Sequence, residues 1–222
     1  MSIEAGRGRR ALVLVAHADD ETLGVGGTLQ KLVKTGWSVS VAIVSDGIVR
    51  VRGVNQDNRP GAHAACRRLG IAPPAFLGFK DQKFDLEAVA DLANAAAGLG
   101  VEPDLVISHV DSDLNADHRI TGEVAKILAR PKKKPVSLLA CEIPSASFWA
   151  GQPFHADYYV DITDELETKI EAFACYEHEL QEYPHPWSRE GLRLLAQYHG
   201  MQSGFRFAEA FKVIRGYEGR LP

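Results

Sequence analysis

The sequence predicts an α/β fold in which helices flank a mostly parallel β-sheet. Short, largely apolar runs alternate with longer amphipathic stretches through the first two-thirds of the chain. Apolar runs of this kind are typical of strands that are covered on both faces. The amphipathic stretches between them are long enough for helical crossovers, which connect neighbouring parallel strands with a right-handed path. These observations favour a Rossmann-like sandwich.

The pattern begins with strand 11–16, which is apolar throughout and leads into a helix at 22–34. Apolar residues at helical spacing fill one face of that helix, and Gly36 ends it. Strand 39–44 follows. A polar, glycine-containing loop is expected from there to residue 58.

The alternation continues beyond that loop, and Gly70 and Pro131 end two of the later helices. The expected helices are 62–69, 86–99 and 120–129, and the expected strands are 75–79, 105–108 and 137–141. The last third is less regular, with expected strands at 158–162 and 211–214 and expected helices at 164–179 and 189–197. No repeat or linker interrupts the chain, so one domain covering residues 1–222 is expected.

Composition excludes several classes of protein. Hydrophobic residues make up 45% and charged residues 24% of the 222 positions, as in ordinary soluble domains. A net charge of -4 argues against a nucleic-acid partner. The apolar run at 11–16 is too short for a secretion signal, and no stretch reaches the ~20 apolar residues of a membrane span. The three cysteines are scattered, as reduced thiols would be. A cytoplasmic protein is expected.

Histidines and acids follow two of the predicted strands. The first strand leads into His17-Ala18-Asp19-Asp20-Glu21, and strand 105–108 leads into a loop that ends at His118. Carboxyl ends of parallel strands lie at one edge of the sheet, where ligands bind. Three consecutive acids would repel one another, and a bound divalent cation would relieve that repulsion.

A catalytic zinc ion takes about three protein ligands and keeps one position open. His17 and Asp20 can converge on one ion across the strand-to-helix turn, and His118 can complete the set. Asp19 would then lie beside the ion as a general base. Asp20 could instead be only a first-turn acid that favours the helix dipole, and this is also the preferred interpretation of Glu21.

The same residues resemble the PIG-L/LmbE-like deacetylases, whose signature is A-H-P-D-D-E near the N-terminus with a distal x-x-D-H. The second motif matches Asn115-Ala116-Asp117-His118. Further segments resemble later landmarks of that family, and they are 76–85, 142–145, 184–188 and 208–211. The resemblance therefore extends over nearly the whole chain.

This resemblance implies a Rossmann-like fold, a zinc ion and hydrolysis of an N-acetyl group on N-acetylglucosamine or a related amino sugar. Another divalent cation could take the place of zinc. By position, His17, Asp20 and His118 resemble the zinc ligands and Asp19 the catalytic base. Asp117 resembles the acid that orients the oxyanion-stabilising residue.

Two positions depart from the family pattern. Ala18 replaces the usual proline, which removes backbone stiffness rather than chemistry. Asn115 lies where better-studied members carry a histidine that stabilises the tetrahedral intermediate. An asparagine can donate a hydrogen bond but bears no positive charge. The second oxyanion donor is therefore left open between Asn115 and His109.

Substrate contacts are less sharply predicted. Arg50 and Arg59 lie in the loop after the second strand and could bind a hydroxyl or a phosphate, although a solvated loop is the alternative. Asp81 follows the third strand within the family-like segment. His185 lies in a proline-flanked turn that could form a sugar-stacking wall, a lid or part of the core. His109 completes the predicted contacts.

The expected reaction releases acetate and a free amine. Zinc would activate a water molecule, Asp19 would take the proton of that water, and a protonated carboxyl, most simply Asp19, would deliver a proton to the leaving nitrogen. The expected partner is an N-acetylated sugar or sugar conjugate. The oligomeric state is open, with a homo-oligomer among the options.

Two other classes of function are weighed. A dinucleotide-binding oxidoreductase would use the glycines of Gly24-Val25-Gly26-Gly27, but its fingerprint should open at the first strand end, where acids lie instead. A non-catalytic metal-binding or sugar-binding module would fit the metal ligands. Such a module has no need for Asp19 as an additional carboxylate.

Overall fold

A computed structural model describes residues 8–50, 53, 55–131, 134–217 and 221–222. The strands are β1 (Arg10–Val15), β2 (Ser38–Ser45), β3 (Ile48–Val49), β4 (Gln56–Asp57), β5 (Ala75–Phe79), β6 (Leu105–His109), β7 (Ser137–Cys141), β8 (Tyr158–Asp161) and β9 (Ala208–Arg215). The α-helices are α1 (Asp20–Lys34), α2 (Arg59–Leu69), α3 (Val89–Ala97), α4 (Ala116–Leu128), α5 (Leu166–Phe173) and α6 (Arg189–Ser203).

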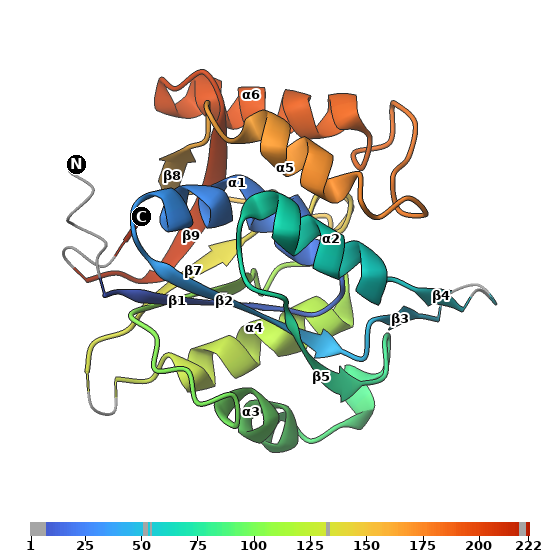
Figure 1. Cartoon of the computed structure of the whole chain (residues 1–222), viewed down its shortest axis with the longest axis vertical. Coiled ribbons are helices and arrows are strands. Elements are labelled where there is room, and N and C mark those ends of the chain that lie inside the picture. Colours follow the sequence, from blue (N-terminus) through green and yellow to red (C-terminus); the bar gives the residue numbers. More distant parts are fainter. Residues whose placement is uncertain (1–7, 51–52, 54, 132–133, 218–220) are drawn as a thin grey trace.

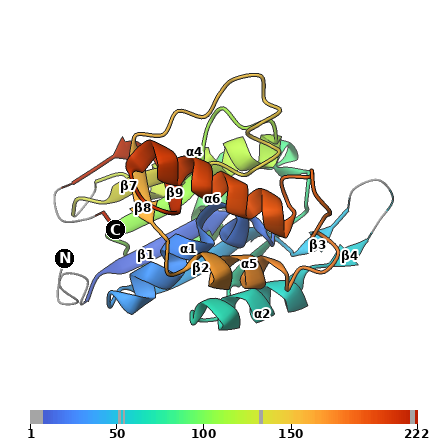
Figure 2. The same cartoon turned by 90° about the horizontal axis from the view of Figure 1, so that it is seen from above.

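Seven strands form one sheet in the order β5-β2-β1-β6-β7-β9-β8. The first five of these run parallel, and β9 joins β7 and β8 by antiparallel pairing. Helices α1, α2, α5 and α6 lie on one side of the sheet, and α3 and α4 lie on the other (Figure 1). Figure 2 shows the same layers from above, with the β3–β4 pair projecting at one end. The predicted α/β sandwich with a mostly parallel sheet is confirmed.

Side chains of the central strand β1 alternate between two hydrophobic cores. Val13 and Val15 pack into the core that includes α1 and α5, whereas Leu12 and Leu14 pack into the core beneath α3 and α4. Because successive side chains of a strand point to opposite faces, a strand covered on both sides must be apolar at every position. The burial of this strand explains the unbroken apolar run.

The register of β1 brings the two predicted site loops together. Val13 pairs with Ile107 of β6, so these strands end side by side. The segment that follows β1 and the segment that follows β6 therefore lie at the same edge of the sheet.

Helix limits differ from the predictions where tertiary contacts decide them. The helix expected at 86–99 is preceded by a 3₁₀ turn, Phe84–Leu86, and its α-helical part is only α3. The backbone N–H of Phe84 donates to the carboxylate of Asp117, 3.1 Å away, which fixes that turn. Helix α4 starts earlier than residue 120 because Asn115 caps it.

Other differences lie in the connecting segments. The predicted loop to residue 58 contains the β3–β4 pair, in which Ile48 is opposite Asp57. Helix α5 is shorter than 164–179, because the chain turns more tightly at Tyr176, whose N–H donates to the carbonyl of Phe173. Within the described residues, no helix has both the length and the apolar character needed to cross a membrane.

Candidate metal centre

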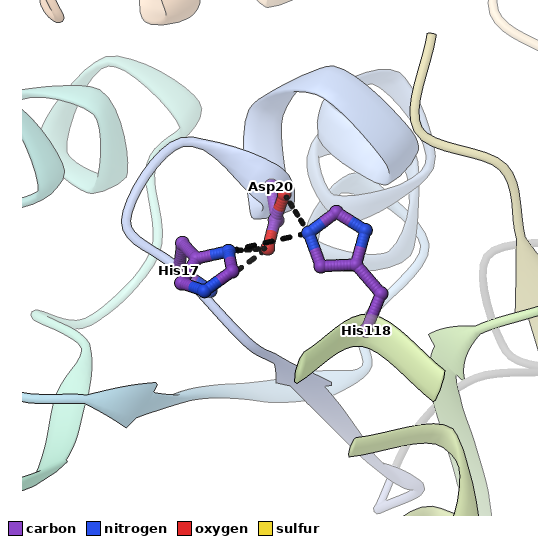
Figure 3. Close-up of side chains that lie close together, drawn as sticks. All are labelled: His17, Asp20 and His118. Atoms are coloured by element: carbon purple, nitrogen blue, oxygen red, sulfur yellow. Dashed lines mark hydrogen bonds and ion pairs between the residues drawn. The ribbon is translucent and has the colours of Figure 1, made fainter. Parts of the chain in front are cut away.

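Three side chains predicted as metal ligands meet at the carboxyl ends of β1 and β6. The Nδ1 atom of His17 lies 3.2 Å from Nε2 of His118 and 3.6 Å from Oδ2 of Asp20. The Nε2 atom of His118 is 3.5 Å from Oδ1 of Asp20. Figure 3 shows the two rings and the carboxylate turned toward one another. Each residue offers one potential ligand atom, and these three atoms lie within 4.8 Å of one another, as binding of a single metal ion requires.

The turn from β1 into α1 places two of these ligands. The N–H of Ala16 donates to Nε2 of His109, 2.9 Å away, where the strand ends. The N–H of His17 donates to Oδ2 of Asp20 at 2.8 Å, and Asp20 opens helix α1. Asp20 is only 2% exposed. The first-turn position therefore does not exclude ligation, since the carboxylate both receives a backbone donor and faces the two rings.

Each of the two predicted ligand histidines is held by a carboxylate on its other nitrogen. Nε2 of His17 lies 3.1 Å from Oδ2 of Asp117 and 3.3 Å from Oδ1 of Asp81. Nδ1 of His118 lies 3.0 Å from Oδ2 of Asp113. A carboxylate in this position fixes the ring orientation and leaves the opposite nitrogen with its lone pair toward a metal.

Electrostatics of the acids favour a cation. Burial raises the pKa of Asp20 to about 7. Burial also raises the pKa of Asp19 well above its usual value, and the neighbouring charges of Asp20 and Glu179 add to this effect. Ionised carboxylates crowded in a buried space destabilise one another, and a divalent cation reverses that balance.

The imidazoles fit the same interpretation. Burial, together with the neighbouring His17, holds the pKa of His118 well below its ordinary value. For His17, burial lowers the pKa, but the hydrogen bond to Asp117 and the charge of Asp20 outweigh it and raise the pKa. A neutral imidazole is the form that binds a metal, so the proton that the raised pKa favours on His17 would be released when a cation binds. The two rings and the Asp20 carboxylate are therefore a donor set that suits a divalent metal ion.

Asp19 lies next to these ligands but outside the donor set. Among the described residues, ligand atoms converge in this group and in a second one, formed by His17, Asp81 and Asp117, and Asp19 belongs to neither. Its backbone has a φ of 132° and a ψ of -31°, a conformation rarely adopted by residues other than glycine. The side chain is buried in the same space as Asp20. One carboxylate thus accompanies the predicted metal ligands without joining them.

Asn115 and Asp117 have structural contacts of their own. Oδ1 of Asn115 accepts the N–H of Asp117 at 2.9 Å, so the Asn115 side chain caps helix α4. The carboxylate of Asp117 accepts the N–H of Gln82 at 2.7 Å as well as facing His17. Asp117 is therefore placed to hold a metal ligand and the segment after β5. The hydrogen bond between the two residues is therefore donated by the backbone N–H of Asp117 and accepted by the side chain of Asn115.

His109 lies behind the ligands. Its side chain is 0% exposed and stacks on His118, with ring centroids 4.2 Å apart and planes within 10°. Nε2 accepts the Ala16 N–H, and burial holds the pKa of His109 well below its ordinary value. This placement gives His109 a packing role in the site wall, behind the ring of His118.

The remaining predicted contacts occupy different places. Asp81 is buried against His17 and accepts the backbone N–H of Arg50 at 2.8 Å. The exposed guanidinium of Arg50 pairs with Asp46 at 2.7 Å. Arg59 is likewise exposed, and it pairs with Asp57 at 2.7 Å. Asp81 thus supports a metal ligand, whereas both arginines are at the surface.

His185 belongs to an aromatic group formed by the C-terminal third. Its ring lies 5.6 Å from that of Trp187 and 6.0 Å from that of Trp149. Trp187 in turn donates its indole N–H to the carbonyl of Pro144, 2.6 Å away. This turn is therefore tied to the segment that follows β7.

Asp113 is a buried residue of this site that the sequence analysis did not single out. Its carboxylate holds the ring of His118. Its Oδ1 atom does accept the N–H of Asn115 at 2.8 Å, as a turn former would. The sequence shows only an acid in a polar loop, and nothing local distinguishes the two roles.

A cavity of about 800 Å³ opens between α6, the segment after β7 and the turn before α6. Its walls include the aromatic side chains of Phe148, Tyr183 and Tyr198, and the buried pair Glu142–His199 also borders it. None of the predicted metal ligands lines this cavity. Its size therefore says nothing about the metal centre.

Comparisons with known proteins identify the relatives of this chain. The family model PIG-L, described as GlcNAc-PI de-N-acetylase, matches residues 12–129, a range that contains both site loops. The diacetylchitobiose deacetylase of Thermococcus kodakarensis is 26% identical over 94% of this chain and 84% of its own.

Two solved structures share the fold. An N,N'-diacetylchitobiose deacetylase from Pyrococcus horikoshii has a TM-score of 0.72 at 22% identity, over 93% of this chain and 84% of that one. A 4-carboxy-2-hydroxymuconate hydratase from Pseudomonas putida has a TM-score of 0.75 at 22% identity, over 94% and 97%. At these identities, the likeness establishes the fold alone.

Proposed function

This chain belongs to the PIG-L family of de-N-acetylases, and from that premise we propose that it removes the acetyl group from an N-acetylglucosamine-type amino sugar. One observation carries the proposal. His17, Asp20 and His118 converge on a single point, while the carboxylate of Asp19 lies beside them without joining the group. A protein that only binds a metal or a sugar has no use for this additional buried acid.

The three converging residues would hold a zinc ion. Two imidazole nitrogens and one carboxylate oxygen form a ligand set known from catalytic zinc sites, which keep a further position open. When bound there, zinc would supply Lewis-acid polarisation of the acetamide carbonyl and of the attacking water. Asp117 and Asp113 would keep the rings of His17 and His118 in place.

Asp19 is the proposed general base and then general acid. Its carboxylate takes a proton from the water molecule as the water oxygen bonds to the acetyl carbon. The same proton is delivered to the amide nitrogen when the carbon–nitrogen bond breaks. The products are a free amine and acetic acid, which loses its proton to solvent as acetate, and Asp19 returns to its starting charge.

The oxyanion needs a hydrogen-bond donor from this chain as well. His109 is fully buried behind the ligands, which leaves the side-chain amide of Asn115 as the proposed donor. The Oδ1 atom of Asn115 is already occupied by the helix cap, so its Nδ2 group would face the substrate. Arg50, Arg59 and His185 are proposed to contact outer groups of the substrate, and Asp81 acts through His17.

Acetate release tests this function. The purified chain, loaded with one equivalent of zinc, would be incubated with N-acetylglucosamine, N,N'-diacetylchitobiose and N-acetylglucosamine linked to a polyol. We expect equal amounts of acetate and primary amine from at least one substrate, loss of activity with a chelator, and recovery with zinc. Stoichiometric zinc binding without acetate from any of the three would support a non-catalytic binding module instead.

A further inference from the structure

Glu21 is a buried acid that the proposed reaction does not use. It follows the metal ligand Asp20 in the first turn of α1 and is 0% exposed. Burying a carboxylate is unfavourable unless its oxygens accept hydrogen bonds. Each oxygen of Glu21 has a specific donor. Oε2 accepts the backbone N–H of Asp19 at 3.0 Å, and Oε1 accepts the hydroxyl of Tyr176.

The first of these bonds acts on a strained residue. With a φ of 132°, the Asp19 backbone adopts a conformation that is energetically unfavourable for a residue with a side chain. Its N–H is held by Glu21, and its carbonyl accepts the N–H groups of Thr22 and Leu23 at 2.9 and 3.0 Å. Bonds on both sides of the Asp19 Cα atom therefore fix the direction in which its carboxylate leaves the backbone.

The second bond anchors Glu21 to a distant part of the chain. Tyr176 lies just after α5, 155 residues from Glu21, and is buried. Its ring packs against Gly61 of α2, where an added Cβ would come within 2.7 Å of the ring. The ring has little room to move, so its hydroxyl provides a fixed donor for Glu21.

We propose that Glu21 and Tyr176 are positioning residues, which hold Asp19 in its strained conformation and thereby aim its carboxylate at the reacting water. The proposal rests on the proposed function, since it assigns to these residues the support of the general base. Neither residue contacts the substrate. Both act through the Asp19 backbone, whereas the metal ligands are supported by a different set of acids, Asp113 and Asp117.

Tyr176→Phe tests the anchor, because it removes one hydroxyl and keeps the buried ring. We expect kcat to fall about tenfold, as for one lost hydrogen bond, with KM and zinc affinity within about twofold of the unchanged protein. Tyr158→Phe is the matched control, since the hydroxyl of Tyr158 also donates to a single acceptor, the carbonyl of Pro222. The control should leave kcat unchanged.

A crystal structure of zinc-loaded Tyr176→Phe gives a measurement that does not depend on activity. We expect the hydrogen bond from Asp19 N–H to Glu21 to be lengthened or lost, with His17, Asp20 and His118 in place. An unchanged kcat in Tyr176→Phe would overturn the proposal. Equal losses of kcat and zinc affinity would overturn it too, because they would show general support of the metal centre.

Two variants of Glu21 test the same proposal, so that it can still be tested if one of the two fails to fold. Glu21→Gln retains an oxygen that can accept the Asp19 N–H, whereas Glu21→Ala removes both acceptors. We expect Glu21→Gln to keep more of the wild-type kcat than Glu21→Ala. If Glu21→Ala is unfolded, we expect the kcat of Glu21→Gln to match that of Tyr176→Phe.

Asp19→Asn separates the proposed base role of Asp19 from the proposed positioning role of Glu21 and Tyr176. If it leaves kcat unchanged, the base role fails and the positioning role with it. A large loss of kcat in Asp19→Asn, together with an unchanged kcat in Tyr176→Phe, would reject the positioning role alone.

Discussion

Two segments contribute to the same site in different ways: the first loop, taken with the first turn of α1 that follows it, comes after β1, and the second loop, taken with the first turn of α4, comes after β6. The first is a tight turn that supplies two proposed ligands, His17 and Asp20, together with the proposed base Asp19. The second supplies one ligand, His118, and the carboxylates that hold both histidine rings. The first loop therefore carries most of the chemistry, and the second carries most of its support.

This division has a physical consequence. Asp117, in the second loop, bonds to His17 in the first, so the orientation of one ligand depends on a residue 100 positions away. The base depends on neither carboxylate of the second loop, since Glu21 and Tyr176 hold its backbone. Metal binding and proton transfer should therefore respond to different substitutions.

The largest effect is expected when the second loop loses its only ligand. His118→Ala should abolish stoichiometric zinc binding and lower acetate release by about 10³-fold or more, because the remaining two ligands cannot hold the ion. Zinc analysis after gel filtration measures this directly. His178→Ala, at an exposed histidine, is the control and should retain both properties. Full zinc occupancy in His118→Ala would contradict the proposal that both loops bind the same ion.

The next effect concerns Asn115, which has two proposed tasks in the second loop. Asn115→Ser keeps a helix cap but removes the amide donor, so we expect normal stability and a kcat about 100-fold lower. Asn115→Ala should also lose about 1 kcal/mol of unfolding free energy, as measured by urea denaturation. An unchanged kcat in Asn115→Ser would leave this residue as a helix cap only.

Carboxylates that support the rings should matter less than the ligands themselves. Asp113→Asn and Asp117→Asn are each expected to weaken zinc affinity by about 10–100-fold, because the ring they hold is less well oriented. Competition with a chromogenic chelator provides the affinity. An unchanged zinc affinity in Asp117→Asn would show that the second loop does not hold the ring of His17.

The smallest effect is expected away from both loops. Arg50→Gln and Arg59→Gln should leave kcat unchanged and raise KM by about threefold, since exposed charged contacts contribute little. Initial rates at varied substrate concentration measure both constants. An unchanged KM in either variant would show that this arginine does not contact the substrate and only forms its surface ion pair, with Asp46 for Arg50 or with Asp57 for Arg59.

Local patterns explain what could be predicted from the sequence. Strands buried on both faces leave unbroken apolar runs, and the residues at their ends are therefore easy to locate. His17, Asp20 and His118 could be proposed as partners because two such ends carried histidines and acids. The structure brings these three together, as that prediction requires.

Long-range contacts explain what could not be predicted. No local pattern links Tyr176 to Glu21, or Asp117 to the backbone of Phe84, because each pair meets only after the sheet and helices have assembled. The contact between Asp117 and Phe84 also fixes the 3₁₀ turn that precedes α3. The place of the His109 side chain could not be predicted for a related reason: the sequence puts this residue near the site, but only the packing shows that its ring lies behind His118.

The central claim is that one acid lies beside the metal ligands and acts as the base. Zinc affinity and kcat of Asp19→Asn, measured on the same preparation, test it most directly. We expect one zinc per chain at unchanged affinity, with a kcat about 10³-fold lower. Loss of zinc as complete as in His118→Ala would place Asp19 among the ligands and contradict the assignment.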